Sequence, residues 1–434
     1  DSWNLEKPEH FNQTMMFPVD GIDNTQIKQA IEELVKHHDM LRAVYRNQQL
    51  EILPISESKL CDFYEFDYRG KDDVKQAIQE RCSEIQASIN LETGSLVKIA
   101  VFETDHDKVM MFCVHHLAID GVSWRILAED FETAVDQIQK NEEIRLPEKT
   151  ASFMEWAEEL EKYASSPSLD CDKAYWEKTI KQIIPITGIT RSMEDIKDED
   201  VVISFDSDTT QKLVLEAGTA YSTEVNDLLL AALTTAIYRW KSDKKIVICL
   251  EGHGREPIED DINITSTVGW FTTQYPVVFD CSEDIQESIV SVKEKLRAVP
   301  NKGLKFGLLY SEKDYIQPDI CFNYLGQIGD LKSDNSTKDQ IAYSAGQNIA
   351  KENKSVSNIL FNGIIANGVL NIQLSYDKKF ASFEEMTSLA KLYEKALVEM
   401  IKHCILKDDT SITISDLEDS DINENELDLI NSFF

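Results

Sequence analysis

Two neighbouring histidines, His115 and His116, follow an apolar run at 108–114 that predicts a buried strand. Asp120 and Gly121 follow in a predicted tight loop, and the apolar spacing after this loop predicts a helix whose start Asp120 and Ser123 can both cap. An imidazole beside a helix start, with a carboxylate four residues on, can take up and release a proton near neutral pH. This stretch is therefore a candidate for acid–base chemistry.

The two histidines are expected to have different surroundings. Adjacent side chains on a strand point to opposite faces, so His115 and His116 cannot easily bind one metal ion or contact one substrate. The pattern favours one histidine in the core and one facing a cleft, without saying which is which. A histidine at a strand end can also be purely structural, and the spacing alone leaves that alternative open.

A second candidate follows another predicted strand, at 244–250. Glu251 stands at its end, and Gly252 and Gly254 permit backbone turns that a side chain would hinder. A carboxylate held at a buried strand edge tends to have a raised pKa, which suits a general acid or base. The alternative is a solvated loop that carries charges. Neither a G-x-G-x-x-G pattern nor a Lys-Ser/Thr pair follows, which argues against a phosphate-binding loop.

Two further stretches combine polar and aromatic side chains. The segment 267–276 is predicted to be a strand, either in the core or in the wall of a channel. Asn323, Tyr324 and Gln327 place an amide, a phenol and a second amide close together in the sequence. Such groups can donate hydrogen bonds to a carbonyl or an enolate oxygen. The sequence has no G-x-S-x-G elbow, which argues against an ordinary serine hydrolase.

The composition excludes several classes of function. The chain has 434 residues with 78 acidic and 44 basic side chains, and this net charge of -34 disfavours binding to nucleic acids or anionic membranes. No apolar run approaches the roughly 18 residues of a membrane span, and no basic and apolar leader opens the sequence. The eight cysteines are scattered without a C-x-x-C pair. We therefore expect a cytoplasmic protein with reduced thiols.

The elements that must position these residues form two mixed units, so we expect an α/β fold. The first unit is predicted to contain strand 10–17, a helix capped by Asn24 or Thr25, strands 41–45 and 50–54, helix 72–88, strands 97–102 and 108–114, and a helix from 123 to about 140. The second is predicted to contain strand 200–205, helices 208–217 and 223–240, strands 244–250 and 267–279, helix 282–297, strands 320–324, 358–366 and 369–376, and helix 382–403.

A connector between the two units sets the expected domain organisation. Amphipathic helices are predicted near 152–163 and 172–183, with a Ser/Pro-rich break at 165–171 between them. The charged stretch 193–200 is predicted to be a surface loop. The expected divisions are an N-terminal lobe at 1–168, a C-terminal lobe at 169–416, and a tail at 417–434 that forms a terminal helix or a docking segment.

Taken together, these motifs resemble a known family. The 115–121 stretch is similar to the signature of condensation-type domains of nonribosomal peptide synthetases, which acyltransferases of the chloramphenicol acetyltransferase type share. Five later motifs resemble the epimerization subfamily and run in its order over nearly the whole chain: 122–127, 226–231, 251–256, 267–276 and 322–326. The sequence departs from the family's first motif, Pro-Ile-Gln before a Trp-Phe pair, because it opens on Asp1-Ser2-Trp3.

The resemblance implies a fold, a reaction and partners. Two chloramphenicol-acetyltransferase-like lobes would form a V, with a tunnel between them for the phosphopantetheine arm of a peptidyl carrier protein that lies upstream in cis. The reaction would be epimerization of an aminoacyl or peptidyl thioester at Cα, from L to a D/L mixture, in the biosynthesis of peptide antibiotics. Such an isomerase needs no cofactor or metal of its own, because the partner supplies the phosphopantetheine.

The resemblance also implies catalytic roles. His116 and Glu251 would be the two acid/base groups on opposite faces of Cα, and which of them deprotonates the L-form is left open. Asn323, Tyr324 and Gln327 would orient the thioester or donate to its oxyanion.

Four residues are expected to support the site. Asp120 would pair with Arg255 and hold the loop, since a buried carboxylate needs a partner. His115 would be the histidine that faces the core, and Gly121 would shape the loop.

Three alternatives remain open at this stage. A condensation enzyme would join two carrier-bound residues, and a non-catalytic condensation-like module would recruit partners. A free-standing acyltransferase would use coenzyme A, which the net charge disfavours.

The tail at 417–434 would face a downstream condensation domain.

Overall fold

The computed structural model describes residues 5–189, 200–258, 262–311, 313–328, 343–353, 357–407 and 409–417. The predicted surface loop at 193–200 and the predicted tail at 417–434 lie almost wholly outside these residues. Within the described part, no helix is long and apolar enough to cross a membrane. All eight cysteines are free thiols, as the sequence predicts.

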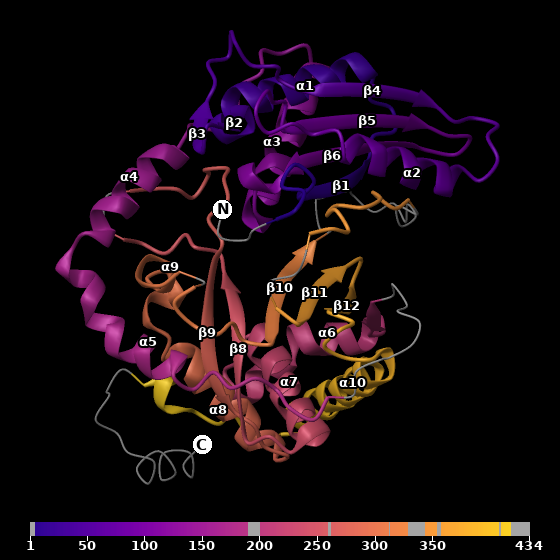
Figure 1. Ribbon diagram of the computed structural model, residues 1–434. Coiled ribbons are helices and arrows are strands. Elements are labelled where there is room, and N and C mark those ends of the chain that lie inside the picture. Colours follow the sequence, from indigo (N-terminus) through magenta and orange to yellow (C-terminus); the bar gives the residue numbers. More distant parts are fainter. Residues whose placement is uncertain are drawn as a thin grey trace.

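The N-terminal lobe is built on a four-stranded sheet with the order β1–β6–β5–β4, drawn at the top of Figure 1. Its members are β1 (Asn12–Pro18), β4 (Asp62–Asp67), β5 (Val97–Glu103) and β6 (Lys108–His115). β5 and β6 form the predicted hairpin, and almost every side chain of β6 is buried, as expected for a continuous apolar strand. A separate hairpin joins β2 (Ala43–Arg46) to β3 (Gln49–Ile52), also as predicted.

Three α-helices cover this sheet: α1 (Asn24–His37), α2 (Val74–Gln86) and α3 (Gly121–Gln139). The predicted cap of α1 at Asn24 or Thr25 is off by one or two residues, because Asp23 accepts from Thr25 N and forms a capping box with Gln26. Asp120, one of the two predicted caps, is the N-cap of α3, so the helix begins at Gly121, two residues before the predicted start at 123.

The C-terminal lobe is built on a six-stranded sheet with the order β7–β12–β11–β10–β8–β9. Its members are β7 (Val201–Ser204), β8 (Lys245–Gly252), β9 (Thr273–Asp280), β10 (Ile320–Ile328), β11 (Ile359–Ala366) and β12 (Val369–Tyr376). The predicted β11–β12 hairpin is confirmed, and Asn367 and Gly368 at its turn have φ of 51° and 72°. β10 extends four residues beyond its predicted end at 324.

Helices pack on one face of this second sheet. They are α6 (Ser207–Leu215), α7 (Val225–Lys241), α8 (Ile285–Arg297), α9 (Phe306–Leu309) and α10 (Phe383–Leu406). α7 is buried along most of its length and packs against α8 and α10, as predicted for a helix that is apolar all round. Short 3-10 helices complete the chain at η1 (Asp39–Arg42), η2 (His116–Ala118), η3 (Pro167–Asp172), η4 (Ala217–Tyr221), η5 (Pro300–Gly303) and η6 (Ile414–Asp416).

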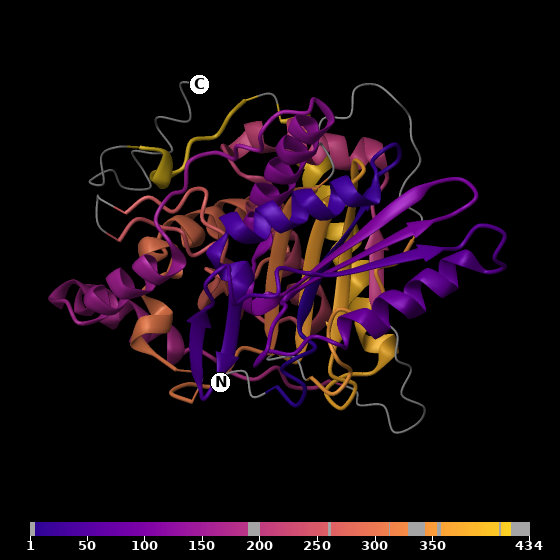
Figure 2. The same cartoon turned by 90° about the horizontal axis from the view of Figure 1, so that it is seen from above.

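The connector between the lobes is helical. α4 (Phe153–Ala164) and α5 (Lys173–Ile180) run down one side of the molecule in Figure 1, with η3 between them at the predicted break. In the view from above, the N-terminal lobe lies over the strands of the C-terminal sheet (Figure 2). The chain is thus a two-lobed α/β protein, while the boundary at 168/169, which falls inside η3, stays a prediction.

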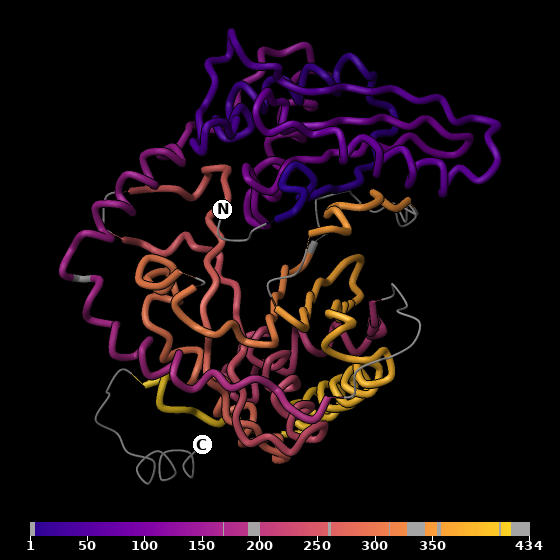
Figure 3. The backbone as a smooth tube through the Cα atoms, viewed as in Figure 1, coloured from indigo at the N-terminus to yellow at the C-terminus, as the bar shows by residue number. Residues whose placement is uncertain are grey.

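Two segments of the C-terminal half return to the N-terminal lobe, and Figure 3 lets the eye follow them as tubes. The first is 262–272, whose Val268 belongs to the N-terminal core. The second is 343–350, where Ile349 bridges Phe11 and the Tyr343 hydroxyl donates to Asp107. The two lobes are therefore joined by these two segments as well as by the helical connector.

The first returning segment corrects a prediction, because the strand expected at 267–279 begins only at Thr273. Its earlier backbone groups bond to side chains instead of to a neighbouring strand. Gly269 N donates to Ser123 Oγ at 3.1 Å and Phe271 N donates to Asp120 Oδ2 at 3.2 Å. Tertiary contact has overridden the strand propensity of this sequence.

A buried ion pair closes the junction between the lobes. Arg255, three residues beyond β8, donates from Nη2 to both Asp120 oxygens at 3.2 and 3.3 Å, and from Nη1 to Thr267 O at 2.7 Å. The guanidinium also lies over the Phe271 ring, with Cζ 3.9 Å from its centroid. The side chains of Arg255 and Asp120 are only 8% and 2% exposed, so neither charge is satisfied by water.

Replacing Arg255 with Met should lower the free energy of unfolding by about 3–5 kcal/mol, because it leaves the Asp120 carboxylate buried without its partner. Urea unfolding measures the loss. Arg125→Met, at an exposed position of α3, is the control and should cost little. The double variant Asp120→Asn/Arg255→Met should lose less than Arg255→Met alone, because no unpaired charge remains. Equal losses for Arg255→Met and Arg125→Met would contradict the bracing role.

Candidate functional site

His116 lies at the point where β6 ends and η2 begins, and two aromatic rings hold its imidazole. The Phe11 ring is stacked on it at a centroid distance of 5.1 Å, and the Trp270 ring lies 4.3 Å away. Burial lowers the pKa of His116, and the backbone of His116, the charge of Asp120 and the backbone of Ile119 oppose this effect. The ring is therefore a fixed and predominantly neutral base near pH 7.

His115 occupies the core of the N-terminal lobe, where the resemblance places it, and it is only 4% exposed. Its Nδ1 accepts from Leu117 N at 3.1 Å, so its Nε2 donates to Pro8 O at 2.8 Å. Burial lowers its pKa to about 4. Both ring nitrogens are thus engaged in holding the strand end.

The structure places Asp120 at the start of α3 and Gly121 beside it on the surface. Asp120 accepts from Ser123 N at 2.8 Å and from Arg255, which is the predicted pairing. Gly121 has no positive φ, and no atom of the described residues outside its chain neighbours lies within 4 Å of where its Cβ would be. The tight loop expected around Gly121 is therefore formed by η2 and Asp120, and Gly121 is a helical residue.

Glu251 is the seventh residue of β8 and stands opposite Gln274 on β9. The Gln274 amide donates to Glu251 Oε1 at 3.0 Å. Burial raises the pKa of Glu251, and the hydrogen bond from Gln274 opposes this rise. A mostly buried carboxyl without a cationic partner is suited to carry a proton near neutral pH.

Strand alternation decides which neighbours Glu251 has. Leu250 and Phe322 are paired across β8 and β10 and face the C-terminal core, so the residues that follow them face the other side. Glu251 and Asn323 are these residues. The thiol of Cys321 lies on the same face, and contact with Cys249, burial and Glu251 hold its pKa well above its ordinary value.

Of the three predicted orienting residues, only Asn323 lies on the same face of the sheet as Glu251. Asn323 follows Phe322, the last β10 residue paired with β8, and so faces the same side as Glu251, whereas Tyr324 packs against the C-terminal core. Gln327 is exposed beyond an irregularity in the β10–β11 pairing that includes Gly326, whose φ is 78°. An extra residue at this point changes the alternation, which the sequence spacing could not reveal.

One short segment contacts both acid/base candidates. Within 269–274, Trp270 lies against His116 and Gln274 donates to Glu251. Four residues of extended chain span about 14 Å at most, so the backbone atoms of Trp270 and Gln274 lie within that distance of each other. The lobes thus bring His116 and Glu251 to one region.

Sequence reasoning missed four side chains that hold the candidates. Trp270 and Gln274 lie inside the 267–276 motif, but no role was expected of either. Gln13 lies 2.9 Å from Nε2 of His116, and Trp124 donates to Gln13. The available signal was the pair of amides Asn12 and Gln13 at the start of an otherwise largely apolar strand.

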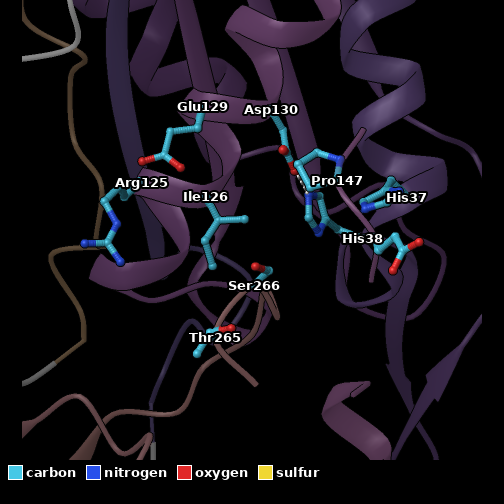
Figure 4. Close-up of a pocket in the computed structure, with 10 residues that line it drawn as sticks. His37, His38, Arg125, Ile126, Glu129, Asp130, Pro147, Thr265 and Ser266 are labelled. Carbon is cyan, nitrogen blue, oxygen red and sulfur yellow. Dashed lines mark hydrogen bonds and ion pairs between the residues drawn. The ribbon is translucent and has the colours of Figure 1, made fainter. Parts of the chain in front are cut away.

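A cavity of about 250 Å³ lies elsewhere in the N-terminal lobe, between α1, α3 and residues 265–266 (Figure 4). His37, His38 and Asp130 at its edge have ligand atoms within 4.8 Å of one another, which suits a metal. His38 Nε2 and Asp130 Oδ2, however, already hydrogen-bond each other at 2.8 Å, and the cation of Arg125 lines the same cavity. Neither His116 nor Glu251 lines it, and the predicted tunnel stays a prediction.

Known sequences match almost the whole chain. The condensation-domain family matches residues 2–423. Gramicidin S synthase 1 of Brevibacillus brevis is 38% identical over 96% of this chain, and tyrocidine synthase 2 of Brevibacillus parabrevis is 36% identical over 98%. The chain spans only 40% and 12% of the lengths of these two relatives.

Solved structures agree with this assignment. The epimerization domain from the third module of tyrocidine synthetase B is 35% identical, with a TM-score of 0.84 over 93% of this chain and 95% of that one. The first condensation domain of the calcium-dependent antibiotic synthetase shares the fold at 14% identity, with a TM-score of 0.71 over 93% of each chain. The chain belongs to the condensation-domain family of nonribosomal peptide synthetases, and its resemblance to an epimerization domain extends over both lobes.

Proposed function

We propose that this domain epimerizes the Cα of an aminoacyl or peptidyl thioester that a carrier protein presents on its phosphopantetheine arm. The observation that carries the proposal is the likeness to an epimerization domain at 35% identity and a TM-score of 0.84. The condensation domain with the same fold is only 14% identical. Condensation, with His116 as the base for peptide-bond formation, is the second candidate, because the family match is to condensation domains.

The two half-buried acid/base groups suit an exchange of one proton at each face of Cα. His116 is biased towards its neutral form and Glu251 towards its protonated form, because burial disfavours the charge on each. Neutral His116 removes the Cα proton, the electron pair of the C–H bond moves onto the thioester oxygen, and Glu251 delivers a proton to the opposite face. The reverse direction uses the same pair with the roles exchanged.

The enolate oxygen needs hydrogen-bond donors where its charge develops. Asn323 is the predicted orienting residue that shares the face of Glu251, and its amide can supply such a donor. The roles proposed for Tyr324 and Gln327 require the chain to bring them round to that face. We therefore assign the oxyanion contact to Asn323 first.

The partners follow from the same proposal. The domain needs a carrier protein, and the relatives that it matches are longer proteins in which a carrier can lie in the same chain. Covalent linkage raises the local concentration of the arm, which would offset the repulsion between the net charge of -34 and an acidic carrier. A downstream condensation domain would receive the product through the tail at 417–434. The phosphopantetheine is the only prosthetic group in this scheme and belongs to the carrier.

Glu251→Gln and His116→Ala should each lower the wash-in of solvent deuterium at Cα of a carrier-bound aminoacyl thioester by at least about a hundredfold. Mass spectrometry and chiral analysis of the released amino acid measure the exchange. Gln139→Leu, on the exposed end of α3, is the matched control and should exchange at the wild-type rate.

Three outcomes would go against this proposal. Full deuterium wash-in by either variant would refute the assigned roles. A dipeptide formed from a donor and an acceptor carrier, without wash-in, would favour condensation. Binding of the carrier by the wild-type domain with neither reaction would indicate a recruiting module.

Gln274→Leu should shift the alkaline limb of the pH profile of exchange to higher pH. The Gln274 amide stabilises the Glu251 carboxylate, so its loss raises the pKa of Glu251 further. The active pair carries one proton, and that proton is lost as the pH rises through the pKa of Glu251. The acid limb, which reports protonation of His116, should stay in place. A shift to lower pH would contradict the assignment of the alkaline limb to Glu251.

A further inference from the structure

A hydrogen-bonded chain of three side chains ends on the base candidate. The indole Nε1 of Trp124 lies 2.8 Å from Gln13 Oε1, and Gln13 Nε2 lies 2.9 Å from His116 Nε2. An indole N–H can only donate, so the Gln13 atom that faces Trp124 is the acceptor oxygen. The amino group of Gln13 must then face His116, and an amino group can only donate. His116 Nε2 is therefore an acceptor that carries no proton.

The fold leaves each member of this chain little freedom. Gln13 lies on β1 opposite Val114, one pair away from the end of β6, so the strand pairing sets its distance from His116. Trp124 is 7% exposed on the first turn of α3, against the Phe112 ring. The Phe11 and Trp270 rings, which both pack against His116, oppose rotation of the imidazole. The arrangement therefore selects one tautomer, and it does so before any substrate is present.

This assignment places the proton of the neutral ring on the other nitrogen. When Nε2 is an acceptor, the proton of a neutral imidazole is on Nδ1. Nδ1 of His116 is buried without a well-aligned hydrogen bond, and the backbone of His116 and of Ile119 favours a proton on the ring. Asp120 and His115 are the titratable groups that act on this ring among the described residues, and Gln13, Phe11 and Trp270 bring no charge.

We propose that Gln13, aimed by Trp124, is a positioning residue that keeps Nε2 of His116 unprotonated, so that this nitrogen can take the proton from Cα. This proposal rests on the proposed function for the identity of the proton donor, but the tautomer itself does not depend on it. In the step, the Cα–H bond breaks, the N–H bond forms at Nε2, and the electron pair goes to the thioester oxygen. The Gln13 amino group has to move off the single lone pair of Nε2 before this nitrogen can take the proton.

The key variant is Gln13→Glu. A carboxylate accepts from both Trp124 and a protonated His116, so it reverses the hydrogen bond at Nε2 and stabilises the imidazolium. Exchange at pH 7 should then fall about tenfold or more, and the acid limb of the profile should move up by about one pH unit or more. The rate should recover at higher pH, where His116 is neutral again. A purely structural defect would lower the rate equally at every pH.

Three further variants separate this role from packing. Gln13→Met keeps the volume and removes the donor, so the acid limb should move up by a smaller amount. Trp124→Phe frees the amide to turn over and should shift the limb in the same direction. Gln76→Glu, on the exposed face of α2, adds the same charge far from His116 and should leave the profile unchanged.

Nitrogen-15 NMR of the histidine-labelled domain tests the proposal without any reaction. The chain has eight histidines, and the signals of His116 are identified by their loss in His116→Ala. At neutral pH the wild-type domain should show Nε2 as unprotonated and Nδ1 as protonated, and Gln13→Glu should show both protonated. Nε2 found protonated in the neutral wild-type ring, or a Gln13→Glu variant with unchanged titration of His116, would overturn the proposal. A wild-type domain with the expected tautomer but no exchange would instead refute the proposed function alone.

Discussion

The buried ion pair between Asp120 and Arg255 is the contact on which the candidate site depends. His116 precedes Asp120 by four residues, and Glu251 precedes Arg255 by four, so each candidate is tied to the pair by a short length of chain. Extended chain of this length reaches about 14 Å at most. A pair that joins α3 to the end of β8 therefore sets how far apart the two lobes can hold their acid/base groups. Because neither charge is exposed to water, the pair resists separation, whereas an exposed ion pair would contribute little.

The carboxyl groups of Asp120 and Glu251 are both shielded from water, but their hydrogen-bond partners differ. Asp120 accepts hydrogen bonds from Arg255, Ser123 and Phe271 N, so its carboxylate is surrounded by donors. Glu251 has the single hydrogen bond from Gln274 and no cationic partner among its described contacts, so burial raises its pKa. The two carboxylates thus suit different tasks: Asp120 is held in an ion pair that joins the lobes, and Glu251 is suited to carry a proton.

The sequence could predict features that depend on local patterns. The burial of α7 followed from its apolar composition, the β11–β12 turn followed from Asn367-Gly368, and strand alternation required different surroundings for His115 and His116. The pairing of Asp120 with Arg255 came from the family resemblance, and its distances and partners could come only from the structure. Features that depend on contact between distant segments could not be predicted. The late start of the strand expected at 267–279 is decided by side chains at the start of α3, which lie about 150 residues earlier in the chain.

The motif at 267–276 shows why such contacts nevertheless leave a continuous pattern in the sequence. Gly269 bonds to Ser123, and a Cβ there would lie 2.5 Å from the Phe153 ring. Trp270 packs on His116, Phe271 binds Asp120 through its N–H, and Gln274 bonds to Glu251. Each position thus has its own partner, and the partners come from both lobes. A segment that threads between two lobes is constrained at almost every residue, whereas a core strand is constrained mainly at alternate ones. The continuous motif is therefore evidence of a segment shared between the lobes, which is how the structure uses it.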